Sequence, residues 1–479
     1  MSRRTNNLLR LLASLLAVML LSACVSREDE ETFEETAENH LIKYINLSIT
    51  VSTGNYATHR APAGGENGDG REAGFERENV VNGITLILYK GSGLYDASAT
   101  VDYIAYFVTT LSSRTAAQTA LAGKTEEAVY TTGNQRLEDG AINTGDTYHA
   151  IVIANRNMTS QFPKGTLISA VRDYPFGASL YSGDAKKPNE CNNFVMTSEN
   201  NDVTINFGTI TPTTVGTSGL LYTVITPILI ERMAARIDFC TQNGNYDATY
   251  DGYKYNVTGA SGDMFVLTSV TPFNLYNENE YLLKRVQDAW PATITTYLGD
   301  ETTSNYVADP NTGNKDNTNT FSYLSPLASP MSTDYQQTMT SSTFTDSDGK
   351  QSIVVGYAKE NTLMPTSHLK KYATGLAITG HYYKKTGETT YTDKGERTYY
   401  GYLRHQGEST SAYPAKSFAA LSDDETGSAS VPMNFGIVRN NIYRVSIESI
   451  APETDETPTV TLNIKVKKWD LFTHATIYM

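Results

Sequence analysis

The stretch YINLSITV, residues 44–51, alternates apolar and polar side chains. Successive side chains of a β-strand point to opposite faces of the sheet, so this period of two predicts a half-buried strand. Its buried face would consist of Ile45, Leu47, Ile49 and Val51. Residues 459–466, TVTLNIKV, have the same period and would bury Val460, Leu462, Ile464 and Val466. Both ends of the chain therefore predict β-structure.

The composition extends this prediction to the whole chain. Thr, Tyr, Gly and Asn recur throughout, and tyrosine alone contributes 32 of the 479 residues. Tyrosine suits half-buried sheet surfaces, because its ring packs while its hydroxyl stays in water. We therefore expect an all-β protein, long enough for two or three domains. The formal net charge of −14 argues against nucleic acid or an anionic bilayer surface as a partner.

Local patterns predict further strands and one helix. Gly83–Tyr89 is apolar on both faces, which predicts a central core strand. The alanine-rich stretch Ala116–Val129 has few helix breakers and predicts the one helix. Further predicted strands are Tyr148–Ala154, Gly375–Tyr383, Arg397–Leu403, Asn441–Ile450 and Val460–Trp469.

Three features divide the chain. Pro227 interrupts the apolar block Leu220–Phe239, and we place a domain boundary there, between residues 61–227 and 228–479. Residues 52–79 are rich in Gly, Glu and Asn and predict a flexible loop. Residues 295–350 are polar and lack an apolar period, which predicts a long surface insertion.

Residues 1–23 have the features of a bacterial lipoprotein signal. Three arginines lie within the first ten residues, and the apolar run Leu11–Leu21 is too short to span a bilayer. The sequence LSAC at residues 21–24 matches a lipobox, so we expect lipidation of Cys24 once residues 1–23 are removed. The alternative is an ordinary secretory signal cut after Ala23. Residues 25–43 would then form a solvated tether.

No motif indicates catalysis, a cofactor or a metal site. The sequence has neither HExxH nor GxSxG, and Gly123-Lys124-Thr125 lacks the leading glycine of a phosphate loop. Residues 309–314 begin like a calcium loop, but Gly313 and Asn314 occupy the positions of a ligand and of the required glycine. Cys191 and Cys240 are isolated, which is typical of small buried hydrophobes, and their pairing stays open. We expect no enzyme, no cofactor and no metal.

Five stretches, taken in order, resemble the fimbrillin family of Bacteroidota, the type V pilins. The resemblance spans almost the full chain except the central insertion, and it implies two tandem transthyretin-like β-sandwich domains with Greek-key-type strands. The five stretches are Arg60–Gly74, Asn79–Tyr89, Glu231–Asp238, Gly436–Tyr443 and Val466–Trp469.

The resemblance also implies how such a subunit matures. Members of the family reach the outer membrane as lipoproteins, and an Arg- or Lys-specific surface protease then removes the lipid and the first strand. A strand from the next subunit fills the vacated groove. Strand addition suits this role, because it pairs exposed backbone groups and places alternate side chains in pockets. The contact runs head to tail, so it can propagate into a filament.

The resemblance assigns roles to particular residues. Cys24 becomes the lipid anchor, and the bond between Arg60 and Ala61 becomes the cleavage site, with Arg71 and Arg77 as alternatives in the same loop. Residues 24–60 become the propeptide, with Ile45, Leu47, Ile49 and Val51 as the plug of the groove. The donor region becomes Val460, Leu462, Ile464 and Val466, or else the tail, residues 471–479.

The expected function is therefore a structural subunit of a cell-surface fimbria that supports adhesion. The expected partners are other fimbrial subunits, the protease and, before maturation, the outer membrane. Two alternatives stay open: a tip or accessory adhesin, and a surface glycan-binding lipoprotein that never polymerises. In addition, Arg60 could be an ordinary loop arginine, and residues 44–51 or 460–466 could be permanent core strands.

Overall fold

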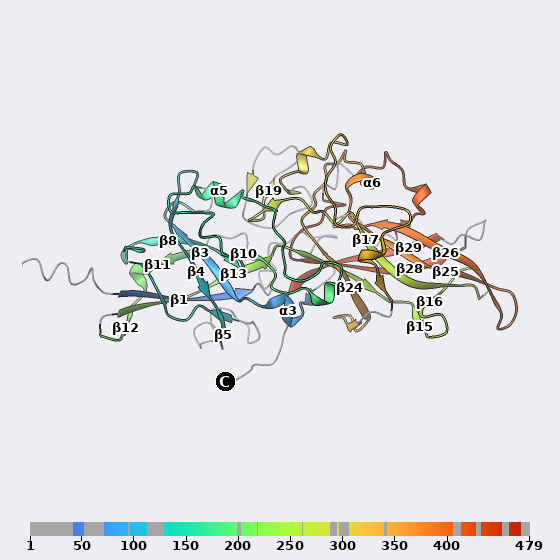
Figure 1. Ribbon diagram of the computed structural model, residues 1–479, viewed down its shortest axis with the longest axis horizontal. Coiled ribbons are helices and arrows are strands. Elements are labelled where there is room, and N and C mark those ends of the chain that lie inside the picture. Colours follow the sequence, from blue (N-terminus) through green and yellow to red (C-terminus); the bar gives the residue numbers. More distant parts are fainter. Residues whose placement is uncertain are drawn as a thin grey trace, which may run out of the picture.

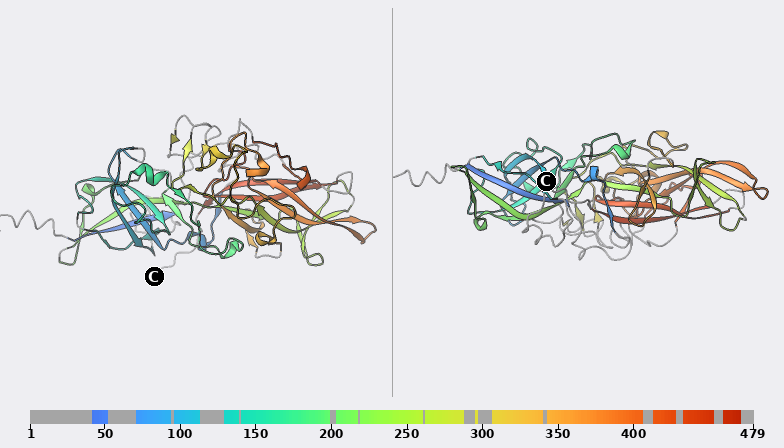
Figure 2. Two further views of the ribbon diagram at one scale, coloured as in Figure 1. Left: turned by 45° about the horizontal axis from the view of Figure 1, so that its top comes forward. Right: turned by 90° about the horizontal axis from the view of Figure 1, so that it is seen from below.

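The computed structural model describes residues 42–51, 71–93, 96–112, 129–138, 140–198, 203–217, 219–260, 262–287, 295–296, 306–339, 343–405, 413–427, 433–452 and 459–470. Within these residues the molecule is almost entirely β-structure, with strands at both ends of an elongated body (Figures 1 and 2). Among these residues, no helix is long and apolar enough to cross a membrane.

The first half of the body is an 11-stranded sheet that carries the N-terminal strand. The strand order is β4-β3-β8-β10-β13-β1-β6-β5, with β11 on β8, β12 on β13 and β7 on β1. These strands are β1 (Ile42–Val51), β3 (Gly83–Tyr89), β4 (Val101–Val108), β5 (Thr110–Ser112), β6 (Val129–Thr131), β7 (Gln135–Arg136), β8 (Thr147–Ala154), β10 (Met196–Ser198), β11 (Val203–Asn206), β12 (Thr213–Val215) and β13 (Gly219–Arg232).

The second half is built from two sheets that face one core. The first has the order β2-β29-β28-β14-β24-β23 with β27 on β29, and the second has the order β15-β16-β17-β25-β26 with β22 on β17. Side chains from both sheets, such as Phe239 of β14 and Phe265 of β17, belong to one buried cluster, as in a β-sandwich.

The strands of the first of these sheets are β2 (Arg71–Ala73), β14 (Ala235–Cys240), β23 (Phe344–Thr345), β24 (Gln351–Ala358), β27 (Tyr413–Ala415), β28 (Asn441–Ala451) and β29 (Thr459–Asp470). Those of the second are β15 (Asn245–Asp247), β16 (Gly252–Asn256), β17 (Met264–Phe273), β22 (Gln337–Thr338), β25 (Gly375–Lys385) and β26 (Tyr391–Tyr402).

Short elements connect the halves and cover their surface. Strand β9 (Pro175–Phe176) pairs with β18 (Glu280–Tyr281), and β19 (Val286–Gln287) pairs with β20 (Thr295–Thr296) and β21 (Tyr306–Val307). The α-helices within the described residues are α3 (Glu76–Asn79), α5 (Ile168–Arg172) and α6 (Leu369–Tyr372). Single 3₁₀ turns lie at Pro188–Glu190, Phe207–Thr209, Thr312–Asn314, Thr333–Tyr335 and Phe418–Ala420.

The all-β prediction is confirmed, and so are the strands predicted from alternation or apolar runs. The stretch 44–51 lies in β1, Gly83–Tyr89 is β3, and Val460–Trp469 lies in β29. The predicted helix Ala116–Val129 falls outside the described residues except for Val129, which begins strand β6. Residue 227 falls inside β13, and the chain passes from the first half to the second at Met233-Ala234, between β13 and β14.

Two expectations about loops were wrong. Residues 71–79 do not continue a loop but form β2 and α3, between the two halves. The insertion is also not purely superficial, since Val307, Asp309 and Lys315 are almost completely buried. The Lys315 ammonium contacts the Asp309 carboxylate at 2.5 Å, so this polar sequence buries opposite charges together. Composition alone does not reveal such a pair.

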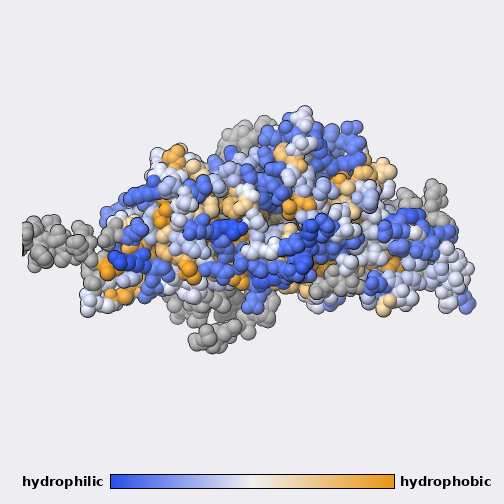
Figure 3. Space-filling view, in the orientation of Figure 1, coloured by the Kyte–Doolittle hydropathy of each residue, from blue (hydrophilic) through white to orange (hydrophobic). Residues whose placement is uncertain are grey.

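The visible surface is mostly hydrophilic. In the face shown in Figure 3, apolar residues occur in small scattered groups among polar ones. Of the described large apolar residues, those exposed are Tyr106, Val108, Leu167 and Tyr246.

Candidate functional site: the first strand and the junction behind it

Strand β1 lies inside the first sheet, with a partner on each side. It runs parallel to β13 from Ile42, opposite Gly219, to Val51, opposite Ile230. On its other side it is antiparallel to β6 and β7, where Ser48 lies opposite Thr131 and Tyr44 opposite Arg136. The N-terminal strand is therefore an inner strand of the sheet and not an edge strand (Figure 1).

Two of the described side chains of β1 fill the core. Ile45 and Leu47 are completely buried and belong to one hydrophobic cluster with residues of β3 and β8. The Leu47 amide donates to Thr132 Oγ1 at 3.1 Å, and the Leu47 carbonyl accepts from the Thr132 amide at 3.2 Å. The backbones of Ile49 and Val51 pair with β13, but their side chains lie outside the described set. Two of the four predicted plug residues thus occupy the core.

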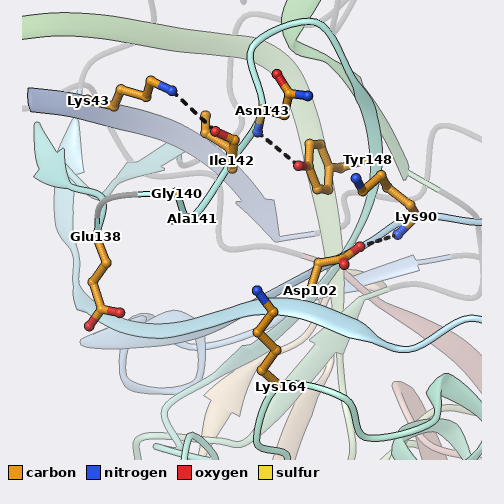
Figure 4. Close-up of a pocket in the computed structure, with 10 residues that line it drawn as sticks. All are labelled: Lys43, Lys90, Asp102, Glu138, Gly140, Ala141, Ile142, Asn143, Tyr148 and Lys164. Atoms are coloured by element: carbon orange, nitrogen blue, oxygen red, sulfur yellow. Dashed lines mark hydrogen bonds between the residues drawn. The ribbon is translucent and has the colours of Figure 1, made fainter. Parts of the chain in front are cut away.

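A cavity of about 410 Å³ opens beside β1 (Figure 4). Lys43 of β1 forms part of its wall, and the Lys43 ammonium donates to the Ile142 carbonyl at 3.3 Å. On the same wall, the Asn143 amide donates to the Tyr148 hydroxyl at 3.0 Å. Because β1 supplies part of the wall, loss of the strand would join this cavity to the vacated groove.

Residues 71–79, which comprise β2 and α3, lie between the two halves. We call them the anchor segment. Strand β2 pairs in parallel with β29, Arg71 opposite Lys468 and Ala73 opposite Asp470. Helix α3 lies where the two halves meet (Figures 1 and 2).

Glu72 of the anchor segment forms buried ion pairs. Its carboxylate lies 2.9 Å from Arg444 of β28, and both side chains are nearly inaccessible to water. The same carboxylate accepts a hydrogen bond from the Ser347 amide at 2.9 Å. Arg444 also contacts Asp238 at 3.0 Å and Asp346 at 3.4 Å. Burial disfavours the charge on Arg444, but these carboxylates outweigh burial and raise its pKa.

Glu78 of α3 occupies a second buried position. Its carboxylate lies 3.0 Å from Arg236 of β14, and both side chains are fully buried. It also accepts from the Phe75 amide at 2.8 Å and from the Tyr357 hydroxyl. The Arg236 guanidinium also contacts the Asp238 carboxylate at 3.0 Å. Burial raises the pKa of Tyr357 well above its ordinary value, and the Glu78 charge adds to this effect.

Arg232, the last residue of β13, completes this region. Its guanidinium lies over the Trp469 ring, 4.6 Å from the centroid, and donates to the Trp469 carbonyl at 3.2 Å. It also donates to the Glu78 carbonyl at 3.1 Å. Arginine binds planar rings and several acceptors at once, so one side chain joins β13, α3 and the end of β29. We call Glu72, Glu78, Arg232, Arg236, Asp238, Arg444 and Trp469 the junction cluster.

The structure thus brings together stretches of sequence that resemble the fimbrillins. Arg232, Arg236 and Asp238 come from the stretch 231–238, Trp469 comes from 466–469, and Glu72 comes from 60–74. Asn440 of the stretch 436–443 accepts from Arg232 Nη1 at 3.3 Å. Sequence reasoning recognised these stretches but did not identify Glu72 and Glu78 as ion-pair partners, because both lie in a stretch without an apolar period.

A second buried group of charges lies nearby. The Arg439 guanidinium is 2.7 Å from the Glu360 carboxylate, and both are fully buried. Glu280 of β18 is also completely buried and accepts from the Glu360 amide at 3.0 Å. Burial raises the pKa of Glu280 to about 8; Arg439 opposes this shift and Glu360 adds to it. Burial therefore favours the protonated form of this glutamate in the folded protein.

The remaining predicted site residues are placed as follows. Cys24, Arg60 and Ala61 lie outside the described residues. Arg71 begins β2, and Arg77 lies in α3, where its guanidinium covers the Phe75 ring at 4.3 Å. Cys191 and Cys240 are buried free thiols, as expected, and burial raises the pKa of the Cys191 thiol to about 12.

The predicted donor stretch is a core strand in this structure. Val460, Leu462 and Val466 are buried, and Ile464 packs partly buried against the same cluster. Strand β29 pairs with β28 along one side and with β27 and β2 along the other. The alternative donor, residues 471–479, lies outside the described residues. Among the described residues, no group of three His, Cys, Asp or Glu side chains could bind a metal.

Comparison with known proteins gives distant structural matches. No model of a known family matches the chain, and no curated protein matches its sequence. Three solved structures illustrate the matches. One is a Parabacteroides distasonis protein provisionally described as a cell adhesion protein, with 15% identity and a TM-score of 0.44 over 90% of this chain and 100% of that chain.

The other two come from Porphyromonas gingivalis. The fimbrilin FimA matches with 15% identity and a TM-score of 0.38 over 90% of this chain and 99% of that chain. The tip fimbrial protein Mfa3, truncated at its C-terminus, matches with 10% identity and a TM-score of 0.40 over 89% and 100%. The structural neighbours are fimbrial and cell-adhesion proteins. At these identities and TM-scores the likeness is distant.

Proposed function

We propose that this chain is a structural subunit of a cell-surface fimbria, exported as a lipoprotein and assembled by strand exchange after proteolysis. The observation that carries this proposal is the position of β1. The strand lies between β13 and β6/β7, and its residues 45 and 47 are completely buried. Among the described residues, β1 is the first element, and the chain continues from it to the rest of the fold through residues 52–70. A single cut in that link frees the strand from the chain.

Parallel pairing supports the proposal. Two parallel strands need a long crossover between them, and here β1 and β13 are separated by most of the first half of the chain. Strand β1 is thus not half of a tight hairpin with β13, and a cut leaves β13 in place. The vacated groove has unpaired backbone groups on both sides and an apolar floor that contacted Ile45 and Leu47. Such a groove is costly in water until another strand fills it.

The donor strand is more simply supplied by the tail, residues 471–479, than by residues 460–466. Removing β29 from its own sheet would expose Val460, Leu462 and Trp469, and Arg232 would lose its contacts with the Trp469 ring and carbonyl. The tail begins directly after β29, so it can extend without disturbing that core. We propose that the tail of one subunit enters the groove that β1 leaves in the next.

The proposal defines where the protein works. Cys24 anchors the precursor in the outer membrane, an Arg-specific surface protease cuts after Arg60, and the mature subunit joins the fimbrium with other subunits. A tip adhesin would share the groove but would not need a donor tail. A glycan-binding lipoprotein would keep both lipid and β1.

The deciding experiment is the mass-spectrometric N-terminus of the protein purified from its native cell surface. We expect the mature chain to begin at Ala61. The variant Arg60→Ala should keep the lipidated N-terminus and stay out of fimbriae, whereas the neighbouring His59→Ala should mature normally. A lipidated Cys24 on all surface material from wild-type cells would refute the subunit proposal and favour an anchored binding protein.

A further inference from the structure

The anchor segment carries two arginines that an arginine-specific protease could cut, Arg71 and Arg77. Between them and β1, residues 52–70 contain one arginine, Arg60, and no lysine. A protease must draw several residues around the cut bond into its active site as an extended chain. The accessibility of the backbone around Arg71 and Arg77 therefore decides which product forms.

The contacts of the anchor segment oppose such unfolding. Around Arg77, the neighbouring Glu78 is fully buried in its contact with Arg236, and Asn79 is 5% exposed. Around Arg71, the neighbouring Glu72 is 6% exposed and pairs with Arg444. Pulling either stretch into a protease would leave Arg236 or Arg444 buried with fewer counter-charges, and such uncompensated buried charge is strongly destabilising.

Gly74 adds a steric contact to these charges. A Cβ atom at Gly74 would lie 2.6 Å from Trp469 Nε1, closer than any ordinary contact. The backbone of the anchor segment therefore lies directly against the Trp469 ring. Phe75 packs edge-on against Phe344, with ring centroids 5.0 Å apart. The segment is fixed by close packing as well as by ion pairs.

We propose that residues 71–79 are a retained anchor: the junction cluster makes Arg71 and Arg77 resistant to arginine-specific proteolysis and confines the maturing cut to Arg60. The inference rests on the proposed function for the existence of a maturing cut, but the protection itself is a property of the folded chain. The mature N-terminus would then stay joined to both halves of the molecule after β1 has left.

The test is limited digestion of the purified full chain by an arginine-specific protease, followed by N-terminal sequencing of the products. We expect the wild type to give a product that begins at Ala61, and none that begins at Glu72 or Glu78. In Glu78→Gln the carboxylate charge opposite Arg236 is lost, and cutting after Arg77 should become roughly tenfold faster or more, since cleavage follows the population of the locally open form.

The matched control is Glu76→Gln, on the same helix, because Glu76 is exposed. It should behave like the wild type. Gly74→Ala gives a second route, because it displaces the segment from Trp469 without removing a charge, and it should also speed the cut after Arg77. All digestions are made well below each variant's melting temperature, so that global unfolding does not contribute.

Three results would overturn the inference. They are a wild-type product that begins at Glu72 or Glu78, equal cutting after Arg77 in Glu78→Gln and Glu76→Gln, and wild-type resistance in Gly74→Ala. A different result would refute the proposed function without affecting this inference. If the cut falls after Arg60 but the peptide containing β1 remains bound on size-exclusion chromatography in the presence of excess tail peptide, strand exchange is refuted while the anchor stands.

Discussion

Glu78 of helix α3 and Arg236 of strand β14 form a completely buried ion pair, 3.0 Å apart, between residues 158 positions apart in the sequence. The pair joins the segment that follows the proposed cut to the strand that begins the second half of the molecule. Buried charges are costly unless they are paired and hydrogen-bonded, and this pair has Asp238, Tyr357 and the Phe75 amide around it.

The first prediction concerns this ion pair. Glu78→Ala leaves Arg236 buried with one carboxylate fewer, and breaking a buried pair costs about 3–5 kcal/mol of unfolding free energy. We expect a loss of this order in urea-induced unfolding of the full chain. Glu76→Ala, at an exposed position of the same helix, should stay within about 0.5 kcal/mol of the wild type. Equal losses in both variants would contradict a role for the buried pair.

The second prediction concerns the plug. Leu47→Ala removes a fully buried side chain from β1, and such truncations cost about 2–5 kcal/mol. The precursor should lose that stability. Protein that has been cut after Arg60 and has lost β1 should have the same unfolding free energy in both cases, because it no longer contains residue 47. Leu86→Ala, equally buried on β3 in the same core, should destabilise both forms. If Leu47→Ala also weakens the mature form, β1 has not left.

The third prediction concerns pH. The pKa of Glu280 is raised to about 8, so the folded state binds a proton that the unfolded state releases at lower pH. Stability therefore falls as pH rises from about 4.5 to about 8, by at most about 1.4 kcal/mol per pH unit from this one group. Glu280→Gln should flatten this part of the stability curve in denaturant titrations at pH 5.5, 7 and 8.5. If the stability of Glu280→Gln falls with pH as steeply as that of the wild type, the pH dependence comes from groups other than Glu280.

The fourth prediction concerns calcium. The stretch 309–314 begins like a calcium loop, but the Asp309 carboxylate already contacts Lys315 at 2.5 Å and the Thr362 amide at 2.7 Å. We expect millimolar CaCl₂ and EDTA to leave the melting temperature unchanged. Asp309→Asn should lower it, because Lys315 would remain completely buried without its counter-charge. A melting temperature that rises with calcium in the wild type would contradict this assignment.

Local sequence patterns predicted the strands because the geometry of a strand imposes these patterns on neighbouring residues. Alternation in residues 44–51 and 460–466 follows from the pleat of a strand with one buried face, and these stretches lie in β1 and β29. Gly83–Tyr89 has apolar side chains on both faces because both faces are buried in the first half. The same reasoning misjudged residues 71–79, where burial depends on charge pairing and not on an apolar period.

The sequence by itself determined the β-rich fold, most strand positions and the arginines available to a protease, since these depend on neighbouring residues alone. Only the tertiary structure decided which strands lie beside β1, that residues 460–466 are a core strand here, and that Glu72 meets Arg444, 372 positions away. Such a contact requires the chain to return to the same place from a distant part of the sequence. Local sequence patterns do not predict such a contact, because an acidic residue looks the same in the sequence whether the fold buries it beside a partner or exposes it to water.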